Sequence, residues 1–246
     1  MNKRLVAISD IHGNTPELPQ GDMLLIGGDL CPTSNAAVDA NWVRNVFNPW
    51  LAKLPIKHKI ATPGNHDFLM YSSKFLMPEL NCVLLEDKTV TVDGVKIHGS
   101  PWSMRFGSWA YMLSDRELQQ KWQQIPKGLD ILLLHGPPHG TADVVHTFDG
   151  YTEHMGSRTL IGMIKSRQPR VVVCGHIHNG YGIYEIDKDF DPNKYKAKYL
   201  GSNQIVVPKN SDKIYIVHAS LLDDNYDMVN KPMIIDLEVE GSQDGA

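Results

Sequence analysis

Nine aspartate, asparagine and histidine side chains stand directly after short apolar segments, and their chemistry suits divalent metal ions. They are Asp10, His12, Asp29, Asn65, His66, Asp67, His135, His176 and His178. Carboxylate oxygens and neutral imidazole nitrogens bind Mn²⁺, Fe²⁺, Zn²⁺ or Co²⁺, and the set contains no cysteine, which disfavours a structural zinc site. Any one of these residues could instead be an ordinary cap or turn residue. Because five separate strand ends carry them, we predict a metal centre.

The spacing within the set favours two ions. Residues two apart in an extended segment point to the same side, so Asp10 and His12 can bind one ion together. His176 and His178 can reach toward a pair of neighbouring ions. Cations about 3.5–4 Å apart need an anionic group between them, and Asp29, alone on its loop, is the natural bridging carboxylate. Two divalent ions bring four positive charges and the two aspartates remove two, so the remaining charge of +2, or +1 with a bridging hydroxide, suits a phosphate ester.

The elements that must position these side chains are short apolar segments with strand character. The predicted strands lie at 4–9, 23–28, 57–62, 130–135 and 170–174. Helical periodicity and capping signals predict helices at 36–54, from Ser114 to about Gln124, and at 157–167. In α/β sheets the loops at the carboxyl ends of strands converge and bind ligands. We therefore expect the nine side chains to gather at one edge.

The remaining segments complete a single α/β domain over residues 1–246 with mixed sheets. A strand is expected at 82–86, and the Asp93-Gly94 pair predicts a hairpin turn. The segments 182–186, 213–219 and 233–239 are predicted to form a later, antiparallel portion. The polar segment 187–212 is expected to protrude, where it could overhang the substrate or pack on another subunit of a homo-oligomer.

The composition is that of a globular enzyme. The chain is 42% hydrophobic and 21% charged, which argues against disorder, and its net charge of −4 gives no broad electrostatic affinity for nucleic acid or an anionic membrane. The longest apolar runs have four or five residues, whereas a membrane span needs about 20. Cys31, Cys82 and Cys174 lack metal-site spacing and are expected to be free thiols in the reducing cytoplasm.

The motifs "DIH", "GD", "GNHD", the histidine of "LLHGPP" and "GHIH", in that order, resemble those of the calcineurin-like metallophosphoesterase superfamily. This match runs from residue 5 to about 180. The stretches "GSPWSMRFGSWAY", "HGPPHGTAD", "GHIHNGYGIY" and "VHAS" are similar to the metallophosphoesterase-domain family of brain proteins and their bacterial relatives, which is grouped with the class III cyclic-nucleotide phosphodiesterases. With that family the similarity extends nearly to the C-terminus.

The resemblance implies a four-layer α-β-β-α sandwich of two mixed β-sheets flanked by helices. It also implies two divalent ions, with Mn²⁺ favoured. One ion would be held by Asp10, His12, Asp29 and His178, and the other by Asp29, Asn65, His135 and His176. By the same resemblance His66 would contact the phosphate and assist the leaving group. Some brain members have glycine at the position of His176; because histidine is present here, full two-metal activity is expected.

The functional hypothesis is a phosphodiesterase that cleaves small or cyclic nucleotide phosphodiesters by attack of a metal-bridging hydroxide. Its alternatives are a phosphomonoesterase or protein phosphatase of the same superfamily, and a non-catalytic scaffold. The chain reads "GDLCPT" where a protein phosphatase would carry an arginine-bearing "GDxVDRG" segment, which disfavours that alternative. Candidate substrate contacts are Arg105, Trp102 and His139, and an aromatic loop with Phe106 and Trp109 could instead plug the sheet edge.

Overall fold

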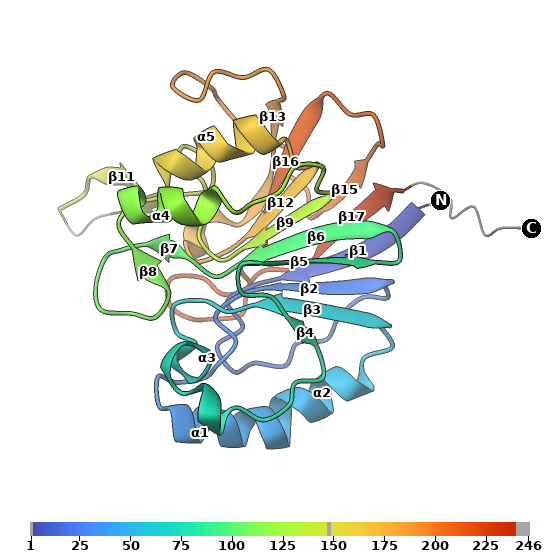
Figure 1. Ribbon diagram of the computed structural model, residues 1–246, viewed down its shortest axis with the longest axis vertical. Coiled ribbons are helices and arrows are strands. Elements are labelled where there is room, and N and C mark those ends of the chain that lie inside the picture. Colours follow the sequence, from blue (N-terminus) through green and yellow to red (C-terminus); the bar gives the residue numbers. More distant parts are fainter. Residues whose placement is uncertain (1, 147–148, 240–246) are drawn as a thin grey trace, which may run out of the picture.

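Two mixed β-sheets form the centre of the molecule in the computed structural model, which describes residues 2–146 and 149–239 (Figure 1). In spatial order the six-stranded sheet contains β15 (Gln204–Val207), β17 (Met233–Glu238), β1 (Asn2–Ile8), β2 (Met23–Gly27), β3 (His58–Thr62) and β4 (Val83–Leu84). The seven-stranded sheet contains β14 (Lys198–Tyr199), β13 (Gly182–Asp187), β16 (Lys213–His218), β12 (Val171–Cys174), β9 (Ile131–Leu134), β6 (Val95–Ser100) and β5 (Lys88–Val92).

The central strands of each sheet run parallel, and antiparallel strands are added outside them. Strands β1, β2, β3 and β4 are parallel neighbours, whereas β17 lies antiparallel to β1. In the second sheet β6, β9, β12 and β16 are parallel, whereas β5 and β13 run the other way. Because parallel strands end at the same edge, the residues after β1, β2 and β3 leave their sheet together, as do those after β9 and β12.

The main core lies between the two sheets. Leu5 and Ala7 of β1 belong to this core, together with Ile131 and Leu133 of β9. The alternate residues of β1 face the opposite way and join a second cluster beneath the helices. A strand that is buried on both faces reads as a continuous apolar run, which is why these strands were recognisable from the sequence.

Helices cover the outer face of each sheet (Figure 1). Over the six-stranded sheet, α1 (Ala36–Trp42), the π-helical turn η1 (Val43–Phe47) and α2 (Asn48–Lys53) follow one another without a break. Over the seven-stranded sheet lie α4 (Asp115–Trp122) and α5 (Arg158–Arg167). At the start of α4 the Glu117 carboxylate accepts a hydrogen bond from the Ser114 backbone N–H, as the capping box predicted. The expected four-layer sandwich is therefore confirmed.

Smaller elements border the sheets and were not predicted. They are the short helices α3 (Phe68–Ser72) and η2 (Lys74–Leu76), the turn η3 (His178–Gly180), the strand pair β7 (Ser103–Met104) and β8 (Met112–Leu113), and the hairpin of β10 (Val144–His146) and β11 (Thr152–His154). All are five residues long or shorter, so periodicity could not identify them.

The structure corrects two expectations about the last third of the chain. The segment 187–212 does not protrude as a whole, because Gln204–Val207 is an edge strand that pairs in parallel with β17. Its alternate residues Ile205 and Val207 are buried, a period of two that the polar surroundings obscured in the sequence. The later strands are also not simply antiparallel, since β16 runs parallel to β12. Among the described residues, none of the helices has the length and apolar composition that a bilayer crossing requires.

Candidate metal centre and substrate pocket

The loops that follow β1, β2, β3, β9 and β12 meet at one place and bring the predicted donor atoms together. Three groups have all their donor atoms within 4.8 Å of one another: Asp10, His12 and His178; His12, Asp29 and His66; Asp29, His135 and His176. Asp29 links the second and third groups and lies between their histidines. Its Oδ2 is 3.5 Å from His12 Nε2, and its Oδ1 is 3.4 Å from His135 Nε2.

Both ring nitrogens of His135 face oxygen atoms, which favours a positive charge at this position. Nδ1 of this buried ring lies 2.9 Å from the Gly27 carbonyl oxygen, and Nε2 lies 2.8 Å from Asn65 Oδ1. Burial by itself would lower the pKa of His135, but the Asp29 carboxylate together with Asp10 and the Gly27 carbonyl raises that pKa to about 9. With no metal bound, a proton supplies the charge. A divalent cation beside Nε2 would supply it instead, so this position fits a metal ion.

Other donors of the cluster are already in the protonation state that metal binding needs. Burial, followed by the nearby His135, lowers the pKa of His176 to about 3, so its ring is neutral. Burial by itself would raise the pKa of Asp10, but His135 and His178 outweigh it and the pKa is lowered. His12 Nε2 is buried and has no hydrogen-bond partner among the described residues. An unsatisfied nitrogen beside ionised carboxylates fits a metal ligand.

Several residues of the cluster have backbone conformations that non-glycine residues rarely adopt. The φ angles are positive at Asp10 (54°), His12 (40°), Asp29 (52°) and His176 (75°). Each such residue costs conformational energy, and strain of this kind collects at functional sites. A Cβ at Gly175, just before His176, would collide with the Asp10 carboxylate, so only glycine allows this close approach.

Hydrogen bonds around the cluster fix the loops that carry it. The buried Asp67 carboxylate accepts from the backbone N–H groups of Gly64 (2.7 Å), Cys31 (2.8 Å) and Leu30 (2.9 Å), which ties the loop after β2 to the loop after β3. Burial and the neighbouring Asp29 charge raise the pKa of Asp67 to about 6. Asp67 therefore positions loops and is not itself among the grouped donors.

Two further hydrogen bonds orient donors directly. The His66 backbone N–H donates to Asp29 Oδ1 at 2.8 Å. His178 Nδ1 donates to the Asp223 carbonyl oxygen at 2.7 Å, which directs Nε2 toward Asp10. Bonds of this type set the tautomer and orientation of a metal-binding histidine.

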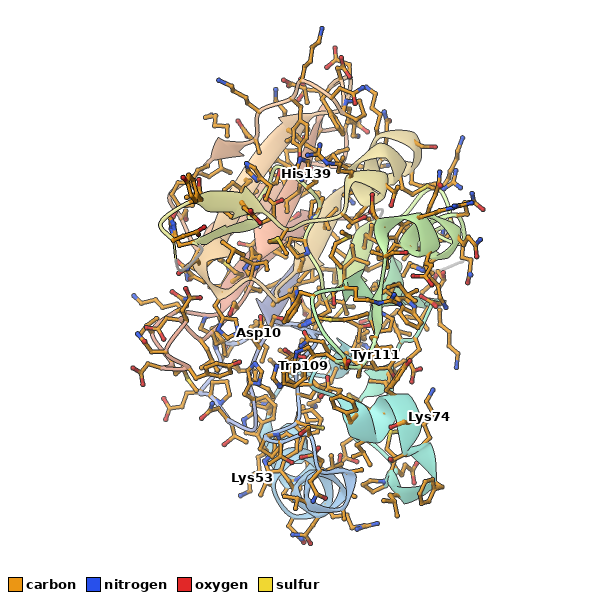
Figure 2. The ribbon with its side chains drawn as sticks, turned by 90° about the vertical axis from the view of Figure 1, so that its left-hand side faces the viewer. Asp10, Lys53, Lys74, Trp109, Tyr111 and His139 are labelled. Atoms are coloured by element: carbon orange, nitrogen blue, oxygen red, sulfur yellow. The ribbon has the colours of Figure 1, made fainter. Side chains whose placement is uncertain are left out.

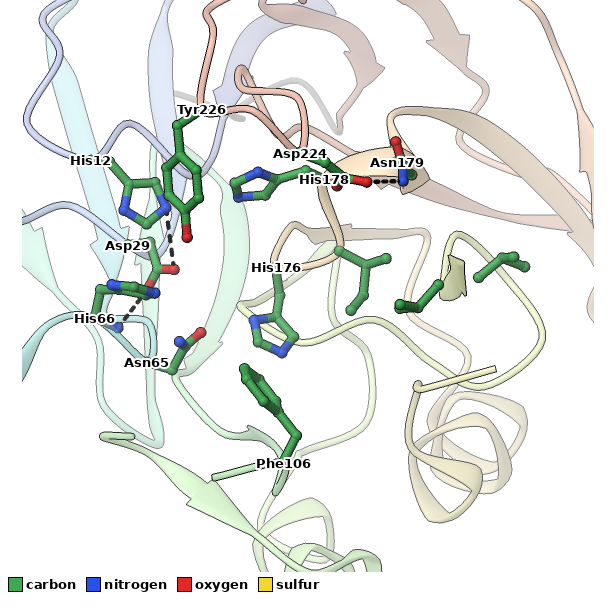
Figure 3. Close-up of a pocket in the computed structure, with 13 residues that line it drawn as sticks. His12, Asp29, Asn65, His66, Phe106, His176, His178, Asn179, Asp224 and Tyr226 are labelled. Atoms are coloured by element: carbon green, nitrogen blue, oxygen red, sulfur yellow. Dashed lines mark hydrogen bonds and ion pairs between the residues drawn. The ribbon is translucent and has the colours of Figure 1, made fainter. Parts of the chain in front are cut away.

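A pocket of about 290 Å³ opens over the donor cluster (Figure 3). Its lining consists of His12, Asp29, Asn65, His66, Phe106, Val144, Val145, His176, Ile177, His178, Asn179, Asp224 and Tyr226. The floor is made of predicted metal donors, and one side is apolar. No lysine or arginine belongs to this lining, and Asp224 adds a negative charge at the rim.

The three predicted substrate contacts do not line this pocket. Arg105 instead forms an ion pair with Glu117, in which Nη2 lies 3.3 Å from Oε2. Trp102 donates its indole N–H to Asp87 Oδ2 at 2.9 Å. His139 lies well apart from Asp10 in Figure 2 and faces Asp143, 3.6 Å away.

The aromatic loop after β7 reaches the site through other side chains. Phe106 lines the pocket, and its ring centroid lies 5.6 Å from that of His176. Trp109 packs on His66, with centroids 4.4 Å apart and planes inclined by 30°. Trp109 thereby holds the imidazole of His66 over the donor cluster.

Sequence reasoning missed the rim formed by Tyr226, Asp224 and Asn179. The Asn179 side-chain amide donates to the Asp224 carboxylate. Tyr226 has a φ of 63°, and burial together with the Asp29 and Asp10 charges raises its pKa. An aromatic residue within the turn-forming segment "DDNYD", just after the last strand of the seven-stranded sheet, was the available signal.

Comparison with known proteins agrees with both resemblances seen in the motifs. The family described as Calcineurin-like phosphoesterase matches residues 3–180. Metallophosphoesterase domain-containing protein 1 of Homo sapiens and of Mus musculus are each 33% identical over 264 residues, covering 95% of this chain and 71% of theirs. One solved crystal structure superposes with a TM-score of 0.50 at 16% identity, covering 74% of this chain and 86% of its own, which is a likeness of fold.

Proposed function

Because this chain belongs to the calcineurin-like phosphoesterase family, whose members are metal-dependent phosphoester hydrolases, we propose that its substrates are small phosphodiesters with an apolar or aromatic ester group. The observation that carries this proposal is the charge of the pocket. The lining offers carboxylates and histidines but neither lysine nor arginine. The phosphate must therefore be bound without help from a lysine or arginine side chain.

The grouped donors support an assignment of the metal ligands. Asp10, His12, His178 and Asp29 would hold one divalent cation, and Asp29, Asn65, His135 and His176 the other. Oxygen and neutral imidazole donors without a thiolate are compatible with Mn²⁺, which we favour. When bound, two such cations supply Lewis acidity that neutralises phosphate charge and acidifies water.

Charge balance separates diesters from monoesters. Two divalent ions bring four positive charges, and the proton that His66 is proposed to deliver adds a fifth. Asp10, Asp29, Asp224 at the rim and the attacking hydroxide remove four, so a single positive charge remains. A phosphodiester carries one negative charge, whereas a monoester carries about 1.5 to 2 at pH 7. A diester is neutralised in this pocket, but a monoester brings excess negative charge that no lysine or arginine of the lining can balance.

The apolar side of the pocket suits the second ester group that distinguishes a diester. Phe106, Val144, Val145 and Ile177 line that side. Phe106 is 55% exposed, so its ring is available for stacking. Aromatic rings stack on nucleobases of any identity. Small nucleotide diesters, including cyclic nucleotides, are therefore the substrate class that we favour.

Among the side chains, His66 is our candidate general acid. Its ring lies over the donor cluster, with its centroid 4.7 Å from that of His12. Packing against Trp109 limits its rotation. An imidazole nitrogen of His66 would transfer a proton to the departing alkoxide, whose high basicity otherwise makes it a poor leaving group.

The test is a substrate panel with Mn²⁺, Fe²⁺, Zn²⁺ and Co²⁺ in turn. It compares bis-p-nitrophenyl phosphate with p-nitrophenyl phosphate, and 2′,3′- with 3′,5′-cyclic nucleotides. We expect kcat/KM for the diester to exceed that for the monoester by at least about tenfold. A monoester that is hydrolysed as well as the diester would refute the assignment.

Replacing Asp224 by Asn tests the charge argument itself. The substitution keeps the side-chain shape and removes the rim charge. The diester preference should narrow by about two- to fivefold because monoester hydrolysis improves. An unchanged ratio would show that the rim charge does not select the substrate.

A further inference from the structure

Tyr226 stands over the candidate metal ligands and has no role in the family motifs described above. Its ring centroid lies 5.0 Å from that of His12 and 5.2 Å from that of His178. In Figure 3 the ring reaches into the pocket with its hydroxyl directed toward Asp29. Tyr226 therefore approaches the place where a phosphate would bind from the side opposite Phe106.

The conformation of this residue is held by its own turn. Asp223 Oδ1 accepts from the backbone N–H groups of Asn225 (2.9 Å) and Asp227 (3.0 Å), and the Tyr226 N–H donates to the Asp223 carbonyl at 3.0 Å. That same carbonyl accepts from His178 Nδ1. The turn that carries Tyr226 is thus fixed directly to a candidate metal ligand.

Burial does not explain why the turn keeps a tyrosine at a φ of 63°. The side chain is 54% exposed. Among residues 2–146 and 149–239 its hydroxyl makes no hydrogen bond. A strained, exposed aromatic residue with a free donor over a catalytic cluster is explained by contact with a ligand.

We propose that Tyr226 is a substrate-binding residue whose phenolic hydroxyl donates a hydrogen bond to a phosphoryl oxygen of the bound ester. The proposal rests on the phosphoester chemistry assigned to this pocket. It also fits the charge balance, because a neutral hydroxyl adds a donor without adding positive charge. In a lining that lacks lysine and arginine, such a donor distinguishes phosphate from uncharged ligands.

The experiment compares Tyr226→Phe with Tyr199→Phe in the full chain loaded with Mn²⁺. Tyr199 is the matched control, because it is similarly exposed (56%) and does not line the pocket. Calorimetry measures the binding of inorganic phosphate, hydrolysis of bis-p-nitrophenyl phosphate gives kcat and KM, and elemental analysis gives the metal content. Tyr226→Phe should weaken phosphate binding and lower kcat/KM by about 10- to 100-fold at unchanged metal content, whereas Tyr199→Phe should change neither.

The outcomes separate this proposal from the proposed function. If the wild type binds phosphate but cleaves no diester, the substrate assignment fails, while weaker phosphate binding by Tyr226→Phe still supports the contact. Equal phosphate affinities in the two variants would overturn the contact whether or not the enzyme is active. Loss of metal from Tyr226→Phe would also overturn it, because the residue would then act through His178. Absence of both phosphate binding and diester cleavage in the loaded wild type would refute both.

Discussion

The two ends of the β-sandwich differ in how their charges are paired. At the end away from the donor cluster, Arg170 connects the two sheets. Its guanidinium donates to Asp130 Oδ1 at 2.8 Å beside the seven-stranded sheet, and to the carbonyl oxygens of Glu238 (2.7 Å) and Val207 (3.2 Å) in the six-stranded sheet. At the cluster end, two buried aspartates and several histidines face one another with no lysine or arginine among the pocket residues.

The difference separates a structural polar network from a binding site. The carboxylate of Asp130 is matched by a guanidinium and by the Lys96 backbone N–H, so its charge is balanced within the protein. Among the described residues, the carboxylates of Asp10 and Asp29 form ion pairs with histidines and not with lysine or arginine, and one of these histidines, His135, has its pKa raised to about 9. A donor set that needs an added positive charge is prepared for cations.

The largest loss of activity is expected from a substitution at Asp29, the carboxylate that both candidate ion positions share. Asp29→Asn should lower kcat/KM by at least about 1,000-fold and reduce bound metal, because the variant removes the charge that both candidate ion positions share. Activity assays and elemental analysis of the purified protein measure both effects. Wild-type turnover in this variant would refute the two-metal assignment.

The same chemical change at the other end is the matched control. Asp130→Asn should leave kcat/KM and metal content unchanged but lower the free energy of unfolding by about 1–2 kcal/mol, because Arg170 loses its charged partner. Urea denaturation of the metal-free protein gives this value. If Asp130→Asn reduced activity as much as Asp29→Asn, the two ends would not differ in the way described.

A smaller loss of activity is expected from a substitution at His66, which also lies at the donor-cluster end. His66→Ala should lower kcat by about 100-fold while leaving the metal content intact, because the residue is assigned to proton transfer and not to metal binding. Rates with a p-nitrophenolate leaving group, which needs little protonation, should fall less than rates with an alkyl leaving group. A variant that loses metal would instead make His66 a ligand.

The smallest effect is expected from Arg105, which the sequence suggested as a phosphate contact. Arg105→Ala should change kcat/KM by less than about threefold, because the guanidinium pairs with Glu117 on the surface and does not line the pocket. Steady-state kinetics with the diester checks this. A loss of tenfold or more would mean that the loop moves Arg105 onto the substrate.

Local patterns predicted the regular elements well where one physical cause dominated. Continuous apolar runs identified β1, β2, β9 and β12, because strands buried on both faces leave no room for polar residues. The capping box of α4 and the Asp93-Gly94 hairpin followed from backbone hydrogen bonding and left-handed turn geometry. The edge strand β15 was missed because its exposed residues merge with a polar segment.

The sequence alone determined which side chains could bind metal, because donor type and position after a strand are local properties. Only the tertiary structure decided which aromatic and polar residues surround them. Phe106, and not Trp102, lines the pocket. Tyr226 lies 214 positions from His12 in the sequence (226 minus 12), yet its ring packs beside that histidine. The physical reason is that strand ends are brought together by sheet pairing, which periodicity reveals. The direction of a loop side chain depends instead on long-range hydrogen bonds, such as the one that His178 Nδ1 donates to the Asp223 carbonyl oxygen. The local turn pattern around Asp223 does not specify that bond.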